Sequence, residues 1–349
     1  MKWNRIAALC LGLSLLAACS PKEQEVSPTP EATVSPAAES TNFPAAGGEV
    51  RVAMLKGPTG LGAAKLMADS DAGETENQYT FSVLAEATEA VAGLSRTEEP
   101  FDIAALPTNL ASTLYHKLDG GVQLLALNTL GVLYILEDGN SVDSLADLEG
   151  KTIHAYGQGA NPEFVLNYLL EENDLTAGED VTVQWYATTD EITTLMASGE
   201  ITLAMLPVPA ATTVLMQNSD VRAAVSLTEE WENAGAEGVL TMGCVVVRTE
   251  FAQEHPETVD TFLKEYGESI AYMSDSDNLD DAAALAETYG IVPKAAVAKR
   301  ALPDANLCFI TGDDMMEGIQ GYYQVLFAAD PASIGGSIPD GKFYYMYNG

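Results

Sequence analysis

Residues 151–170, KTIHAYGQGANPEFVLNYLL, hold a short strand, a glycine-rich turn and the start of a helix in one continuous stretch. The extended run 152–156 leads into Gly157-Gln158-Gly159-Ala160-Asn161-Pro162, after which apolar residues recur at helical spacing. Pro162 suits the first helical position, and Asn161 suits the N-cap. The two glycines permit a tight turn with exposed backbone N–H groups. These groups and the helix dipole predict a site for a partly negative ligand group.

Two other interpretations of this stretch remain open. It can be a plain strand–turn–helix junction with no ligand. It can also be a dinucleotide-binding loop, which is disfavoured because Pro162 stands where that motif needs its third glycine.

Similar junctions recur along the chain, which favours the ligand-binding interpretation. Strands at 50–55, 101–106, 181–186 and 201–206 each run into a turn rich in Gly, Pro, Thr or Asn, followed by a helical pattern. Alternating strands and helices predict an α/β fold of mostly parallel sheets covered by helices on both faces. Such sheets bind ligands outside the carboxyl ends of their strands. The candidate ligand-binding residues in the predicted loops are Gly57, Pro58, Thr59, Gly60, Thr108, Asn109, Gly157, Gln158, Gly159, Ala160, Asn161, Thr188 and Pro207.

The first residues have the pattern of an export signal. Lys2 and Arg5 precede the uncharged run 6–16, which is too short to span a bilayer. Leu16-Ala17-Ala18-Cys19 follows and resembles the lipobox of bacterial lipoproteins. That resemblance implies a signal peptide at 1–18 and lipid attached to Cys19. An ordinary cleaved signal with a chance cysteine is the alternative.

Residues 19–49 are predicted to be the lipidated cysteine and a disordered tether. Prolines recur among Ser, Thr, Glu and Ala, which leaves too little apolar surface for a core. A flexible coil of this length spans roughly 30 Å. The globular body could therefore reach a membrane partner while it stays anchored.

Charge and cysteine content exclude some classes of function. The chain has 51 acidic and 16 basic residues, a net charge of −35, which argues against nucleic acid as a partner. Acidic pairs such as Asp313-Asp314 are explained as helix starts, and their spacing predicts no metal site. Beyond Cys19, Cys244 and Cys308 can form a disulfide or remain two buried thiols.

Four motifs in order resemble a known family. They are the strand and loop 50–60, the run 101–104 leading to 107–109, SLADLEGKTI at 144–153, and AMLPVP at 204–209. Together with the lipobox, they resemble the solute-binding lipoproteins of ABC importers, in the branch of nitrate, sulfonate/taurine and thiamine-pyrimidine (NMT1/THI5-like) binders. The resemblance covers residues 50–349.

The resemblance implies a type II periplasmic-binding-protein fold. Lobe 1 would be 50–135 plus 243–349 and lobe 2 would be 138–240, with crossings near 134–140 and 236–243. A small molecule would bind between the lobes and close the hinge. The protein would act as a monomer without a cofactor, outside the cytoplasm, and would deliver its ligand to an ABC permease in the membrane.

The loops themselves indicate what kind of ligand to expect. The five loops contain one basic residue, Lys56, which argues against nitrate or sulfonate. Hydroxyls, amides and backbone N–H groups suit a small polar organic molecule, neutral or with one weakly anionic group. A pyrimidine-like or amide-bearing nutrient is the expectation.

Two other functions occur on folds of this kind. Thiamine-pyrimidine synthases resemble the same family, and they rely on a histidine, a cofactor lysine and a cysteine cluster. This chain has His116, His154 and His255 but no cysteine cluster, so we expect no catalytic residues and no enzyme. A lipoprotein that senses a ligand for a membrane kinase stays open as the second alternative.

Overall fold

The computed structural model describes residues 48–236 and 238–347. These residues belong to one compact unit of the chain. The predicted signal peptide, Cys19 and nearly all of the tether lie outside the described residues. Among the residues that are described, no helix is long and apolar enough to cross a membrane.

The first sheet has six strands in the order β11-β4-β10-β3-β1-β2. Its strands β1, β2 and β3 pair in parallel, whereas β10 runs antiparallel to both β3 and β4, and β11 runs antiparallel to β4. The bounds are β1 Glu49–Leu55, β2 Gln78–Leu84, β3 Ile103–Pro107, β4 Val122–Leu130, β10 Thr241–Arg248 and β11 Leu307–Ile310.

The second sheet has five strands in the order β7-β6-β8-β5-β9. Here β6 pairs in parallel with β7 and β8, and β5 runs antiparallel to β8 and β9. The bounds are β5 Leu133–Asp138, β6 Thr152–Tyr156, β7 Thr182–Tyr186, β8 Leu203–Pro207 and β9 Val221–Ser226.

The predicted two-lobed α/β fold is confirmed, but both sheets are mixed rather than mostly parallel. The reason lies in how the chain returns to the first sheet. Thr241 at the start of β10 pairs with Leu130 at the end of β4. When a strand begins beside the last residue of its neighbour, it must run antiparallel to that neighbour.

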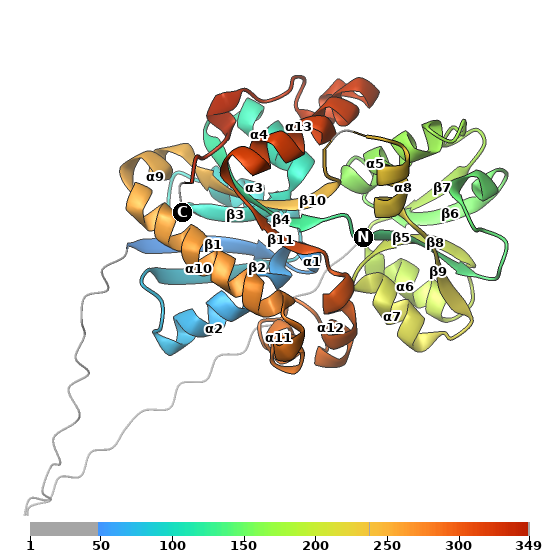
Figure 1. The fold of residues 1–349 in the computed structure, drawn as a ribbon, viewed down its shortest axis with the longest axis horizontal. Helices are drawn as coiled ribbons and strands as arrows, with labels where there is room; N and C mark the ends of the chain where they lie inside the picture. The colour runs from blue at the N-terminus through green and yellow to red at the C-terminus, as the bar shows by residue number, and fades with distance from the viewer. Residues whose placement is uncertain (1–47, 237, 348–349) are drawn as a thin grey trace, which may run out of the picture. The chain divides into compact units, whose positions relative to one another are not determined.

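Helices cover the first sheet on both faces (Figure 1). Alternate residues of β1 enter different clusters: Val52 and Met54 pack with α2, α10 and α11, while Ala53 and Leu55 pack with α3, α4 and α13. These six helices and three others, α1, α9 and α12, have the bounds α1 Pro58–Leu61, α2 Ala64–Ala72, α3 Ala87–Leu94, α4 Thr108–Lys117, α9 Thr249–Glu254, α10 Pro256–Ser274, α11 Leu279–Thr288, α12 Ala295–Ala301 and α13 Gly312–Ala329.

Four helices follow or join the strands of the second sheet. They are α5 Asn161–Glu171, α6 Thr189–Ala197, α7 Ala210–Gln217 and α8 Leu227–Asn233. Single 3₁₀ turns complete the described elements at Leu145–Leu148, Ser276–Asn278, Leu302–Asp304, Pro331–Ile334 and Gly341–Phe343. The strand β9 and helix α8 were not predicted from the sequence.

Two passages connect the sheets. The first is Gly131 and Val132, between β4 and β5, and the second lies between the end of β9 and the start of β10. The first passage comes earlier than the predicted 134–140, because residues 133–138 already form β5 of the second sheet. The lobe boundaries derived from the family resemblance remain a prediction.

The two cysteines of the described chain are free thiols. Cys244 is fully buried in β10, and Cys308 is partly buried in β11. Burial raises the pKa of both thiols, to about 12 for Cys308. Both therefore stay protonated at neutral pH and pack as small apolar groups.

Candidate ligand-binding site

The loops chosen from sequence lie where predicted, directly after the carboxyl ends of β1, β3, β6, β7 and β8. Three of these strands belong to the second sheet and two to the first. Whether the loops bind a ligand is a separate question, which depends on what their polar groups already contact.

Thr241, the first residue of β10, brings two of the loops together. The Thr108 and Thr241 hydroxyl oxygens are 3.0 Å apart. The Asn161 side-chain amide donates to the Thr241 carbonyl oxygen at 3.0 Å. Thr108 follows the first sheet and Asn161 follows the second, so the return passage ties both sheets into one buried junction.

Asn161 is a structural link, and its predicted N-cap role is wrong. The helix α5 begins at Asn161, and Ala160 occupies the N-cap. The Asn161 oxygen accepts a 2.6 Å hydrogen bond from the Tyr322 phenol, and its Nδ2 also lies 3.2 Å from the Met242 sulfur. The residue is 1% exposed, and the hydrogen bonds of its side chain hold α5 to α13 and β10.

Two backbone N–H groups of the glycine turn before α5 already donate to nearby acceptors. Gly157 and Gly159 have φ of 91° and 72°, as the tight turn requires. The Gly159 N–H donates to the Glu163 carboxylate at 2.5 Å, and the Ala160 N–H donates to the Gly157 carbonyl. Gln158 is exposed between them. A ligand here would therefore compete with Glu163 for one of the predicted donors.

The loop after β1 is also held by the protein. The Gly57 N–H donates to the Ile291 carbonyl at 3.0 Å, and the Asn128 amide donates to the Thr59 carbonyl at 3.0 Å. Gly243 permits this packing, because a Cβ there would lie 2.8 Å from the Thr59 hydroxyl. Pro58 starts α1, a helix of four residues, and Gly60 is buried within it.

Asn109 keeps an unused acceptor. Its side-chain nitrogen donates to the Ser333 carbonyl at 3.3 Å, and the residue is 5% exposed. Its side-chain oxygen is buried and has no hydrogen-bond partner among the described residues. A buried carbonyl without a donor costs about 1–3 kcal/mol. Asn109 is therefore a predicted site residue with an unsatisfied hydrogen-bond acceptor among the described residues.

The remaining two candidates follow or end strands of the second sheet. Thr188 is exposed at the N-cap of α6, and its side chain makes no capping hydrogen bond to the helix. Pro207 is partly buried at the end of β8. The next residue, Val208, packs into the apolar cluster of the first sheet, and its N–H donates to the Val132 carbonyl at 3.0 Å.

Sequence reasoning missed an aromatic group beside the junction. Trp231 of α8 is 1% exposed, and its ring lies 5.2 Å from Tyr168 of α5 and 6.1 Å from Tyr322 of α13, measured between centroids. In the sequence, Tyr322 shows only as the first of two adjacent tyrosines. Its partners lie more than 80 positions away in the chain, so spacing could not reveal them.

Two charged residues near the strand ends are the acidic Glu86 and the basic Lys56. Burial raises the pKa of the Tyr156 phenol, and the negative charge of Glu86 raises it further. Glu86 precedes α3 on the first sheet, whereas Tyr156 ends β6 on the second. Lys56 is exposed. On β6, the His154 Nδ1 lies 2.8 Å from the Tyr186 hydroxyl, and burial lowers the pKa of this imidazole.

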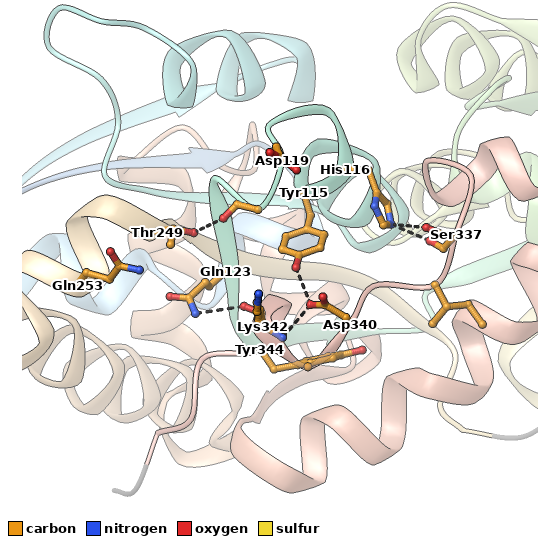
Figure 2. Close-up of a pocket in the computed structure, with 13 residues that line it drawn as sticks. Tyr115, His116, Asp119, Gln123, Thr249, Gln253, Ser337, Asp340, Lys342 and Tyr344 are labelled. Atoms are coloured by element: carbon orange, nitrogen blue, oxygen red, sulfur yellow. Dashed lines mark hydrogen bonds between the residues drawn. The ribbon is translucent and has the colours of Figure 1, made fainter.

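None of the predicted ligand residues lines either of two cavities in the described part of the chain. The larger, about 690 Å³, lies beside α4 and the carboxyl-terminal segment (Figure 2). The smaller, about 240 Å³, lies between α5 and the end of α13. Within residues 48–236 and 238–347, no three His, Cys, Asp or Glu side chains gather as a metal site.

Comparison with solved structures identifies the fold. An ABC transporter structure from Parabacteroides distasonis matches with a TM-score of 0.70 and 19% identity, over 85% of this chain and 98% of that one. The periplasmic aliphatic sulphonate binding protein SsuA from Escherichia coli matches with a TM-score of 0.66 and 13% identity, over 86% and 94%. The chain has a periplasmic-binding-protein fold. The alkanesulfonate-binding protein SsuA from Xanthomonas axonopodis pv. citri, bound to MOPS, matches with a TM-score of 0.61 and 15% identity, over 80% and 93%.

Part of the chain also matches a family model in sequence. The model of the NMT1/THI5-like family matches residues 121–277 of this chain. No curated protein matches the chain. The resemblance stated from the sequence motifs is therefore confirmed over the second sheet and the elements that flank it, and its lipoprotein part stays a prediction.

Proposed function

We propose that this chain is an extracytoplasmic substrate-binding protein, which captures a small polar organic molecule between its two sheets and delivers it to an ABC permease. The observation that carries the proposal is the NMT1/THI5-like match at 121–277 on a periplasmic-binding-protein fold. The junction of Thr108, Thr241 and Asn161 supports it, because ligand loops of both sheets meet there.

The proposed ligand is neutral or carries one weakly anionic group. Several structural neighbours bind sulfonates or nitrate by name. In this chain, Lys56 is the single basic residue of the five loops, and Glu86 adds a negative charge beside Tyr156. A fully ionised anion would meet little compensating charge. An amide-bearing or pyrimidine-like nutrient would find hydroxyls and backbone donors, and it could supply the N–H that the Asn109 oxygen lacks.

The proposal includes the location and state of the protein. Residues 1–18 would direct export, Cys19 would carry lipid, and the segment up to residue 49 would tether a monomer to the outer side of the bacterial cell membrane. The charge of −35 supports a small molecule rather than nucleic acid as the partner. Binding without turnover is also part of the proposal, since the named neighbours are binding proteins.

A ligand screen followed by scattering tests the proposal. Pyrimidines, amides, sulfonates and nitrate are screened by thermal shift, and hits are titrated by calorimetry. A genuine ligand raises Tm, and at saturation it lowers the radius of gyration in small-angle X-ray scattering. A hit with an unchanged scattering profile would argue against a closing receptor. Mass spectrometry of the recovered hit would expose an enzyme if the compound were chemically altered.

A further inference from the structure

The carboxyl-terminal segment, residues 331–347, forms a strap across the outside of α4 and β4. The Ser112 hydroxyl donates to the Ile334 carbonyl at 2.7 Å, and the Tyr345 N–H donates to the Leu124 carbonyl at 2.9 Å. The strap turns at Gly335, where a Cβ would lie 3.0 Å from the His116 ring and from the Thr113 backbone. The strap is thus fixed along its length, and the cavity of about 690 Å³ lies between it and α4, β4 and α9.

The cavity lies near one end of the strands of the first sheet, and the predicted ligand loops lie near the other end. Strand β10 runs from one end to the other. Its Gly243 pairs with Pro107, at the start of a predicted ligand loop. Its other end, Arg248, pairs with Val122, next to Gln123 in the cavity wall. The cavity therefore cannot be a part of the site proposed between the sheets.

Hydrogen bonds fix one part of the cavity wall. The Tyr115 phenol donates to the Asp340 carboxylate at 2.6 Å (Figure 2). The His116 Nε2 lies 2.7 Å from the Ser337 carbonyl, and the Gln123 amide donates to the Lys342 carbonyl at 3.2 Å. Burial and the hydrogen bond to Asp340 raise the pKa of Tyr115 to about 12. These pairs join α4 and β4 to the strap, so the cavity keeps its shape without a ligand.

Aromatic rings make a second part of the wall. Tyr115 and Tyr344 line the cavity, and each packs against Phe343, with ring centroids 5.0 and 5.3 Å apart. Both tyrosines are 7% exposed. Packed rings of this kind offer an apolar surface that costs little entropy to order.

The lining also holds polar side chains from α9, from the strap and from the loop after α4. Among the described residues, the Asp119 carboxylate, the Gln253 amide and the Lys342 ammonium make no side-chain hydrogen bond or ion pair. Figure 2 shows Gln253 and Gln123 on the same side of the cavity. Carboxylates accept, an ammonium donates, and amides do both. The lining carries the carboxylates of Asp119 and Asp340 and the ammonium of Lys342, so it presents charges of both signs together with neutral polar groups.

We propose that this cavity is a second binding site, which takes a neutral polyhydroxylated molecule of sugar size. Sugar hydroxyls donate and accept at once, which matches a wall of carboxylates, amides and one ammonium beside aromatic rings. The volume of about 690 Å³ falls in the range of roughly 300–1,000 Å³ typical of small-molecule sites. The site is independent of the ligand proposed between the sheets.

The test uses the full chain with sucrose, trehalose and N-acetylglucosamine as probes, observed by saturation-transfer NMR and calorimetry. At least one sugar is expected to bind in about the millimolar range, a contact typical of a few hydrogen bonds. The variants Asp119→Asn and Gln253→Ala should each weaken that binding about tenfold. Asn suits position 119, where the backbone φ is 50°.

Matched controls separate local from general effects. Asp313→Asn and Gln324→Ala change the same residue types at exposed positions of α13 and should leave sugar binding unchanged. Absence of binding by all three sugars at about 50 mM would overturn the proposal. The proposal would also be overturned if the controls weakened sugar binding as much as the cavity variants do, or if both cavity variants bound the sugars unchanged. Spermidine is tested as a cationic probe, and its binding in place of the sugars would overturn the proposal too.

Discussion

The Tyr322 phenol donates a 2.6 Å hydrogen bond to the Asn161 side-chain oxygen, so the carboxyl-terminal helix α13 holds the first turn of α5. These residues belong to elements that flank different sheets. Asn161 also donates to Thr241 at the return passage. One amide therefore joins three segments where the proposed hinge and the proposed ligand loops meet.

Tyr322→Phe is expected to destabilise the protein by about 1–2 kcal/mol, because it leaves the buried Asn161 oxygen without its donor. Urea unfolding measures the loss. Tyr323→Phe is the matched control: its phenol donates to the Thr108 carbonyl at 3.0 Å, within the first lobe. Both variants should lose stability, but faster hydrogen exchange at residues 161–166 is expected for Tyr322→Phe alone. Equal exchange in both variants would contradict the role of Tyr322 as a link between lobes.

Ligand binding is expected to change the fluorescence of Trp231. This ring packs between Tyr168 and Tyr322, on opposite sides of the junction, so hinge motion alters its surroundings. Trp185, on β7, packs within the second lobe and should respond less. Most of the ligand-dependent signal should survive in Trp185→Phe and be lost in Trp231→Phe. The reverse pattern would place the moving surface elsewhere.

Gly159→Asp is expected to weaken binding of the proposed ligand by about 1–3 kcal/mol, roughly ten- to a hundredfold. The substitution adds a negative charge beside Glu163 at a backbone φ of 72°, in the turn that precedes α5. Calorimetry with the ligand found by the screen measures the change. Gly159→Ala has the backbone strain without the charge, and nothing lies within 4 Å of an added Cβ. If Gly159→Asp folds and binds as the wild type does, the loop is only a turn.

Cys19→Ala is expected to release the protein from the membrane, since the substitution removes the sulfur that would carry the lipid. Fractionation of cells expressing each form measures the distribution. Cys308→Ala serves as the control, because Cys308 lies inside the folded body and should have no effect on anchoring. Retention of Cys19→Ala at the membrane would exclude lipid attachment as the anchor.

Stability should fall in mild acid through His154. Burial lowers the pKa of this imidazole in the folded state, so the unfolded chain takes up a proton first as pH falls. The contribution of His154 is complete above its unfolded pKa of about 6.5, and it is lost as pH falls toward the lower folded value. Urea unfolding between pH 7.5 and 5 measures this slope. His154→Gln should flatten the slope over that range, and an unchanged slope would assign the acid sensitivity to other groups.

The sequence alone determined the local pattern of this protein. Strands ending in Gly, Pro, Thr and Asn before helices predicted the α/β fold and the positions of the five loops, because turn chemistry and periodicity act over a few residues. The long helix α10 buries residues that recur at helical spacing in the sequence, Phe262 and Tyr266 among them. Motif order predicted the family that matches over 121–277.

Tertiary structure decided what the polar residues of those loops do. Asn161 reads as an N-cap and ligand residue in sequence, yet Tyr322 and Thr241 occupy its amide from positions 161 and 80 residues away. Likewise, no local signal shows that β10 returns antiparallel or that the strap 331–347 encloses a cavity against α4. Such pairings depend on which segments the packed core brings together. These contacts join residues far apart in the sequence, and their separations follow no helical or strand period. They depend on the fold of the whole chain.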